Sequence, residues 1–136
     1  MRETDRVGTI ESGLCVLLGV EEGDQERDAV WMAGKLARLR IFADDEGRMN
    51  RSVIDVGGSI LLISQFTLAG DCSRGNRPSF VSAAQPSLAQ QLYDRIAALL
   101  QHEHNLEVVT GDFGASMAVE IHNDGPVTII VRSEGV

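Results

Sequence analysis

The stretch Ile60-Leu61-Leu62-Ile63-Ser64-Gln65-Phe66-Thr67 follows the pair Gly57-Gly58. Its first four residues are apolar without alternation, which predicts a central strand covered on both faces. Polar side chains come directly after this run. Because the end of a buried strand is a common place for a binding site, Ser64 to Thr67 are the first candidates for one.

Two amphipathic helices are expected, one before and one after this strand. Asp24 is a suitable N-cap for a helix over about residues 25–38, in which Val30, Ala33 and Ala37 line an apolar stripe. Pro86-Ser87 opens a second helix, with Ser87 and Gln90 at capping-box spacing. Its apolar stripe consists of Leu88, Leu92, Ile96 and Leu99.

Further apolar runs predict the other strands. They cover residues 6–10, 14–20, 106–110, 118–123 and 127–131, with a shorter extended segment at 41–42 and a turn at 44–47. Neither a linker nor an internal repeat divides the chain, so residues 1–136 are expected to form a single domain. Two helices with six or seven strands predict an α+β fold.

Composition and charge exclude several classes of protein. The chain has 136 residues, of which 43% are hydrophobic and 24% charged, as in ordinary globular proteins. No apolar run is long enough to span a bilayer, and the charged N-terminus has no apolar signal region, so a cytoplasmic location is expected. The net charge of −8 argues against broad non-specific binding of nucleic acid. Arg74 and Arg77 form the one local basic segment near the candidate site.

No metal or cofactor is expected. Cys15 lies in an apolar run and is predicted to be a small core residue, whereas Cys72 lies in a polar segment. A disulfide between them is not expected in a cytosolic protein. Neither cysteine has a second cysteine or a histidine at the spacing of metal ligands.

Side-chain catalysis finds little support in the sequence. Ser64 is not in a G-x-S-x-G elbow, and no phosphate-binding glycine loop is present. Thr67 could act as a nucleophile only beside a base. His122 is the nearest candidate base, but strand alternation places it on the face opposite Asn123. Because the sequence shows no nucleophile with an adjacent base, catalysis by main-chain groups is the remaining interpretation.

The stretch Asn123-Asp124-Gly125-Pro126-Val127-Thr128 lies between two predicted strands. A Gly-Pro step interrupts backbone pairing because proline has no N–H to donate. One interpretation is a tight hairpin turn. The other is a rigid pair of carbonyls that senses the shape of a small ligand. Together with the hydroxyls, amide and aromatic ring of residues 64–67, such carbonyls would suit recognition of a nucleoside-linked ester.

At this point the chain resembles the D-aminoacyl-tRNA deacylase family. The similar segments occur in the family's order and cover nearly the whole chain from residue 7 to residue 131. They are Gly13 to Val20, Leu39-Arg40-Ile41-Phe42, Gly47-Arg48-Met49-Asn50, Ser64-Gln65-Phe66-Thr67-Leu68, Arg77-Pro78-Ser79-Phe80 and Asn123-Asp124-Gly125-Pro126-Val127-Thr128.

The resemblance implies a carboxylic ester hydrolase that removes D-amino acids and mischarged glycine from tRNA and rejects L-aminoacyl-tRNA. It implies a homodimer with a barrel-like antiparallel or mixed sheet and two packed helices. Ser64, Gln65, Phe66 and Thr67 would line the catalytic pocket for the 3′ end of aminoacyl-tRNA, with main-chain groups and the substrate's 2′-hydroxyl at work. A cis Gly125–Pro126 peptide would enter the partner's site as the chiral gate, with Asn123 beside it. We also expect Arg74 and Arg77 to contact the tRNA.

One departure from the family pattern concerns the start of the chain. The family usually begins with another strand ahead of the one expected at residues 6–10, and that first strand is absent from this sequence. It normally carries an arginine that helps to fix the Gly-Pro loop. This motivates an alternative function, a non-catalytic or weakly active, dimeric tRNA-binding homologue.

Overall fold

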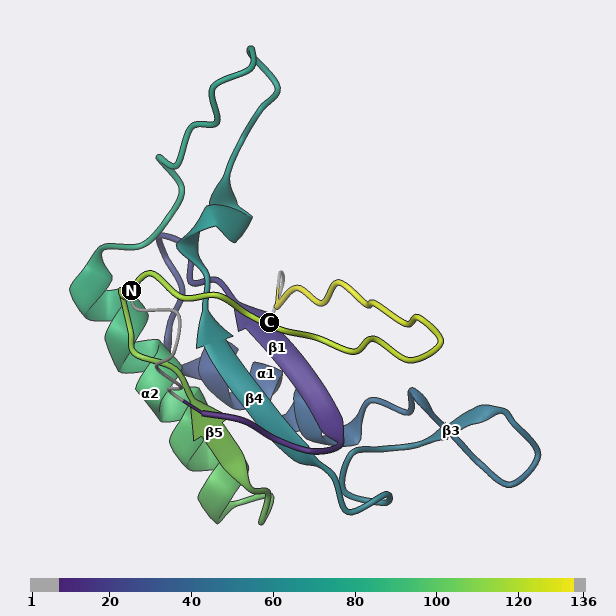
Figure 1. Ribbon diagram of the computed structural model, residues 1–136. Helices are drawn as coiled ribbons and strands as arrows, with labels where there is room; N and C mark the ends of the chain where they lie inside the picture. Colours follow the sequence, from purple (N-terminus) through teal and green to yellow (C-terminus); the bar gives the residue numbers. More distant parts are fainter. Residues whose placement is uncertain (1–7, 134–136) are drawn as a thin grey trace.

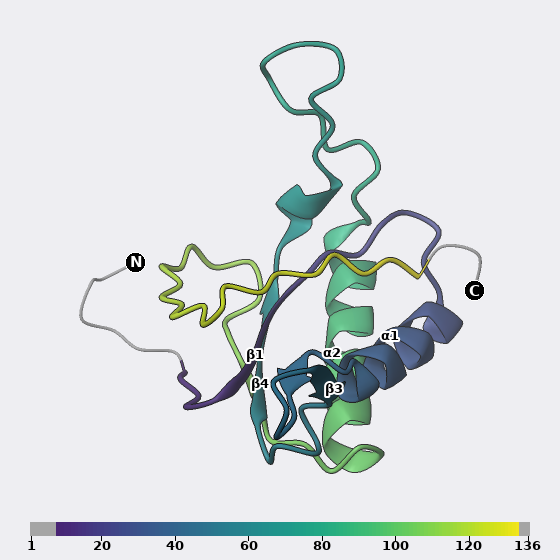
Figure 2. The same ribbon diagram turned by 90° about the vertical axis from the view of Figure 1, so that its right-hand side faces the viewer.

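The computed structural model describes residues 8–133 of the chain. A three-stranded sheet with the order β1-β4-β5 forms its centre, and two helices cover one face of this sheet (Figures 1 and 2). The strands are β1 (Gly13–Leu18), β4 (Ser59–Ser64) and β5 (Val108–Thr110), and the helices are α1 (Glu26–Arg38) and α2 (Pro86–His102). The α+β class and the two packed helices are confirmed.

Strand β4 is the central strand, as the apolar run predicts. It pairs in parallel with β1, where Leu14 lies opposite Ile60, and with β5, where Thr110 lies opposite Leu62. Ile60 and Leu62 are fully buried against the helices. On the other face Ile63 is buried but Leu61 is only half-buried, so the predicted cover on both faces is incomplete.

The core lies between the sheet and the two helices, which also pack against each other. Burial of these side chains supplies the main driving force for folding. The core consists of Leu18, Val20, Ala29, Ala33, Leu36, Ala37, Val53, Ile60, Leu62, Leu92, Tyr93, Ile96, Ala97, Leu99, Leu100 and Leu106.

Both helices have a glutamine as their N-cap instead of the residue predicted to cap them. Gln25 is the N-cap of α1 and forms a capping box with Asp28. The prediction of Asp24 is wrong because its carboxylate accepts the Glu21 N–H at 2.8 Å and closes the preceding turn. Helix α2 opens at Pro86, as predicted, but its N-cap is Gln85 and no side-chain hydrogen bond caps it, so the predicted capping box of Ser87 and Gln90 is wrong.

A second structural unit is a two-stranded antiparallel ribbon of β2 (Phe42–Ala43) and β3 (Met49–Arg51). The turn predicted at residues 44–47 joins them, and Gly47 has a φ of +80° there. The Asp44 carboxylate accepts hydrogen bonds from the Asn50 amide and from the Arg48 and Glu46 N–H groups. The Asn50 bond, followed by that from Arg48, lowers the pKa of Asp44. The carboxylate therefore holds the ribbon together at neutral pH.

Two predicted strands do not form, and the described part of a third is not a strand either. Residues 118–123 and 127–131 run as irregular chain, as do residues 8–10, whereas residues 6 and 7 lie outside the described part. A strand needs a hydrogen-bonding neighbour, and a two-stranded hairpin by itself is marginal in water. In the described part of the chain, no strand pairs with residues 118–131. The sheet accordingly has open edges and does not close into a barrel.

Neither of the helices between residues 8 and 133 is long and apolar enough to cross a membrane.

Candidate functional site

The candidate site begins where β4 leaves the sheet. Ser64 is the last residue of β4 and lies opposite Leu18 of β1. The Gln65 N–H donates to the Leu18 carbonyl at 2.8 Å, so the contact between the strands extends one residue further. The chain then turns into the short 3₁₀ helix η1 (Phe66–Ala69). The four predicted residues therefore lie together at the carboxyl end of the central strand.

Thr67 has a hydroxyl but no base beside it. The Gln65 side-chain amide donates to the Thr67 hydroxyl oxygen. Within residues 8–133, no histidine or carboxylate forms a hydrogen bond with Thr67. His122 is exposed on a different segment. The geometry thus lacks the nucleophile–base pair that side-chain catalysis of ester hydrolysis requires.

Phe66 provides an exposed aromatic surface next to Thr67. Its side chain is 59% exposed, and its ring meets the ring of Phe80 edge-on with 5.2 Å between centroids. Gly70 allows this contact, because a Cβ there would lie 3.0 Å from both the Phe80 ring and the Thr67 carbonyl oxygen. A supported and exposed ring of this kind suits stacking with a nucleobase. The contribution of Phe80 was not anticipated from the sequence.

The basic segment lies on an arm that projects beyond η1 (Figures 1 and 2). Asp71 and Ser79 exchange main-chain hydrogen bonds of 2.8 and 2.9 Å at the base of the arm. Arg74 and Arg77 are exposed in its outer part. Two guanidinium groups are therefore presented to solvent on the side of the molecule where β4 ends.

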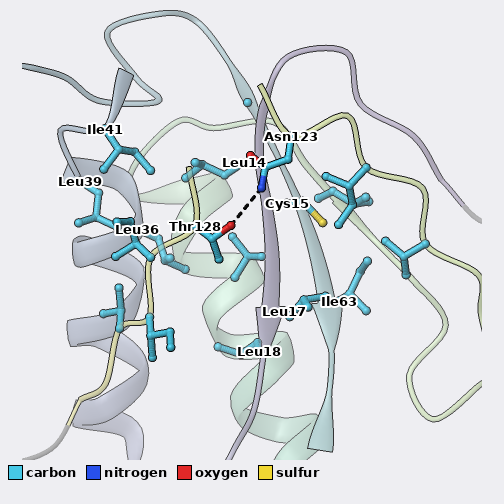
Figure 3. A pocket seen from close by; sticks show the side chains of 18 of the residues that line it. Leu14, Cys15, Leu17, Leu18, Leu36, Leu39, Ile41, Ile63, Asn123 and Thr128 are labelled. Atoms are coloured by element: carbon cyan, nitrogen blue, oxygen red, sulfur yellow. Dashed lines mark hydrogen bonds between the residues drawn. The ribbon is translucent and has the colours of Figure 1, made fainter. Parts of the chain in front are cut away.

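The Asn123–Thr128 turn is braced by one side chain. Asn123 donates from Nδ2 to the Thr128 hydroxyl at 3.0 Å (Figure 3). Its Oδ1 accepts the Val127 N–H at 3.1 Å. The Gly125–Pro126 peptide is cis, as the resemblance implied. Gly125 has a φ of +126°, and a Cβ there would lie 2.9 Å from Val127 Cγ2. Only glycine fits this position without strain.

This turn and η1 are separate within one chain. The chain before Gly125 projects from the face of the sheet opposite the helices, and the tip of the projection points away from η1 in both views (Figures 1 and 2). The chain then returns toward α1, where the Ser133 hydroxyl donates to the Asp28 carboxylate at 2.9 Å. No hydrogen bond joins the turn to residues 64–67 in the described part. The two halves of the predicted site are therefore not brought together in one protomer.

A broad concavity of about 1840 Å³ surrounds β1, between residues 117–133 and α1, and Leu36 and Leu39 line it on the helix side (Figure 3). It does not contain Ser64 to Thr67, and its walls are largely apolar. Cys15 and Leu17 of β1 point into it, so the prediction of Cys15 as a core residue is wrong: alternation turns it away from the helices. Partial burial raises the pKa of the Cys15 thiol, which leaves it protonated and unreactive.

Comparison with known proteins supports one family. A family described as D-Tyr-tRNA(Tyr) deacylase matches residues 2–132. A D-aminoacyl-tRNA deacylase of Geobacter sulfurreducens is 57% identical over 128 residues, which are 94% of this chain and 84% of that protein. The one of Chlorobaculum parvum is 55% identical over 129 residues, 95% of this chain and 87% of that protein.

Two solved structures share the fold. A c-Myc DNA Unwinding Element Binding Protein matches with a TM-score of 0.86 and 37% identity, over 93% of this chain and 86% of that one. A probable eukaryotic D-amino acid tRNA deacylase matches with a TM-score of 0.57 and 17% identity, over 75% and 74% of the two chains. The second likeness concerns the fold alone.

The bracing of the turn leads to a first prediction. Replacement of Asn123 by Ala removes both hydrogen bonds and should lower the NMR order parameter of the Val127 amide from about 0.85 to below about 0.6. Thr128→Val is the matched control, since it removes one bond and keeps the bond between Asn123 and the Val127 N–H. Equal order parameters in the wild type and the Asn123 variant would contradict the bracing role.

Proposed function

The chain belongs to the D-Tyr-tRNA(Tyr) deacylase family, and we propose that it hydrolyses the ester bond of D-aminoacyl-tRNA at the junction of β4 and η1. It is a carboxylic ester hydrolase that proofreads aminoacyl-tRNA by removing the D-amino acid. The observation that supports this location of the active site is the position of four predicted residues at the end of the central strand, namely Ser64, Gln65, Phe66 and Thr67. One domain, located in the cytoplasm, would perform the reaction.

Main-chain groups are proposed to stabilise the transition state. Because η1 begins at Phe66, the N–H groups of Phe66 and Thr67 have no acceptor within this short helix. Water that attacks the ester carbonyl places negative charge on the carbonyl oxygen, and an N–H group fixed in position stabilises that charge. The 2′-hydroxyl of the terminal ribose would assist the water, as the family resemblance implies. This mechanism fits a site in which Thr67 has no base.

The substrate's terminal adenosine has a plausible position beside these groups. The exposed ring of Phe66, which Phe80 supports edge-on, offers a face for stacking of the adenine. Ser64 and Gln65 directly precede Phe66 in the chain, and the Gln65 amide donates to the Thr67 hydroxyl. Stacking would place the 3′ ester close to the first amide groups of η1.

Chiral selection is assigned to the turn that Asn123 braces. The Gly125 and Pro126 carbonyls would occupy the space that an L-amino acid needs for its side chain. A D-amino acid points its side chain elsewhere, and glycine has none, so both would be accepted. A gate of this kind depends on rigidity, which the two hydrogen bonds of Asn123 supply.

The gate is proposed to act in the partner subunit of a homodimer. Within one chain the turn points away from η1, so a second copy is needed to complete the site. The segment that carries the turn exposes large apolar side chains, as expected of a surface that becomes buried on association. They are Val119, Ile121, Ile129 and Ile130. Pairing of this segment on assembly would also extend the open sheet toward a barrel-like, mixed arrangement.

Arg74 and Arg77 are proposed to contact the phosphate backbone of the tRNA acceptor end. The net charge of the protein is −8, so attraction for tRNA must come from local positive charge. Both side chains are exposed on the arm that projects beyond η1. Contacts there would orient the tRNA without reading its sequence.

A paired deacylation assay tests the proposed reaction. The purified protein should release D-tyrosine from D-Tyr-tRNA at least about a hundredfold faster than L-tyrosine from L-Tyr-tRNA, because a steric penalty of about 3 kcal/mol corresponds to that factor. Glycyl-tRNA should be hydrolysed as well. Equal rates with the D and L substrates would overturn the chiral gate. Binding of tRNA without release of either amino acid would favour the non-catalytic homologue.

The role of Thr67 can be separated from that of the main chain. Thr67→Ala should retain kcat within about fivefold if the N–H groups of η1 catalyse the reaction. A nucleophile would behave differently, since its loss costs about a millionfold in a serine protease. Thr67→Ser is the matched control because it keeps a hydroxyl. Loss of activity in the Ala variant together with activity in the Ser variant would assign the chemistry to the hydroxyl.

The dimer can be tested at its proposed apolar surface. Ile130→Asp places a charge on the projecting segment and should shift the protein from dimer to monomer in sedimentation velocity, with loss of deacylation. Val81→Asp is the matched control for the oligomeric state, since both side chains are 83% exposed and Val81 lies near the base of the arm. A wild-type protein that sediments as a monomer at micromolar concentration would rule out the shared site.

A further inference from the structure

Tyr93 connects α2 to the central strand through its hydroxyl group. The side chain is 3% exposed, and its hydroxyl donates to the Leu62 carbonyl oxygen at 2.6 Å. Leu62 precedes Ser64 by two residues in β4. This buried hydrogen bond therefore lies immediately before the residues assigned to ester hydrolysis.

The bond forms at the point where β4 loses a neighbour. Thr110, the last residue of β5, lies opposite Leu62, so β4 continues to Ser64 without a partner on that side (Figure 1). Burial raises the pKa of the Tyr93 phenol and has the larger effect, whereas the Gly111 main chain and the Thr110 side chain lower it. A side chain on α2 thus takes the place of the missing strand pairing.

The ring itself is held firmly. Tyr93 and Phe113 have ring centroids 5.8 Å apart in a tilted arrangement, and Tyr93 belongs to the main core. Burial, with a smaller contribution from Asp94, raises the pKa of Tyr93 above its usual value of 10. The hydroxyl consequently stays protonated at neutral pH and remains a donor to Leu62.

We propose that Tyr93 is a positioning residue for the deacylation reaction, because its hydroxyl fixes the carboxyl end of β4 and thereby the direction in which Ser64 and Gln65 lead into η1. This inference rests on the proposed function of that junction. N–H groups that stabilise an oxyanion must lie at hydrogen-bond distance from the reacting oxygen. A displacement of about 1 Å from a remote change can reduce the rate by about a hundredfold. Tyr93 would control this placement without touching the substrate.

Tyr93→Phe tests the proposal, since it keeps the ring and removes the hydroxyl. Ser59→Ala is the matched control: the Ser59 hydroxyl donates to the Glu107 carboxylate at 2.7 Å, at the opposite end of β4. Each variant is compared with the wild type in deacylation of D-Tyr-tRNA, with kcat and KM determined separately. The main-chain amide resonances of residues 64–68 are recorded for all three proteins, together with their melting temperatures.

Tyr93→Phe should lower kcat about tenfold and change KM by less than about twofold, with shifted amide resonances at residues 64–68. Ser59→Ala should retain both kinetic constants and those resonances. Unchanged resonances in the Phe variant, or equal loss of kcat in the two variants, would overturn the positioning role. If the wild type itself does not release D-tyrosine, the proposed function fails, and the resonances alone then decide whether Tyr93 places the junction.

Discussion

Strand β4 forms hydrogen bonds along both edges and buries one face beneath two helices. The positions of the neighbouring strands, of the helices and of residues 64–67 depend on these two constraints. Burial of Ile60 and Leu62 sets which side chains face the helices, and the parallel pairing with β1 sets the register. Both neighbouring strands end near the point where β4 ends. Residues 64–67 therefore leave the sheet where main-chain groups become free for chemistry, while the strand before them is paired on both sides up to Leu62.

The site makes little use of titratable side chains. Among residues 8–133 no base forms a hydrogen bond with Thr67, the Cys15 thiol stays protonated, and His122 is exposed on another segment. What the junction does offer is main-chain N–H groups at the start of η1 and the exposed ring of Phe66. Because every residue has a main chain, chemistry of this type leaves no side-chain signature, which explains why a motif search finds no triad.

The separation between the turn and the junction is the physical reason for proposing that a second copy of the chain completes the site. Selection by shape requires a rigid element close to the ester, and the turn that two hydrogen bonds of Asn123 brace points away from its own η1. The apolar side chains on the same segment would remain exposed to water in an isolated protomer. Association would cover them and complete the site in a single step, so that an unassembled chain would lack the means to discriminate between D- and L-amino acids.

Sequence alone determined the central strand, the two helices, the α+β class and the membership of a family, since apolar periodicity and ordered motifs are local properties. It also predicted Ser64 to Thr67 and the Gly125–Pro126 turn as candidate site residues. Tertiary structure decided the features that depend on contacts between distant segments. Residues 118–131 do not form strands because no described strand pairs with them. Cys15 faces outward because the helices cover only one face of the sheet. The bond from Tyr93 to Leu62 joins residues 31 positions apart, so only the packing of α2 on β4 could reveal it.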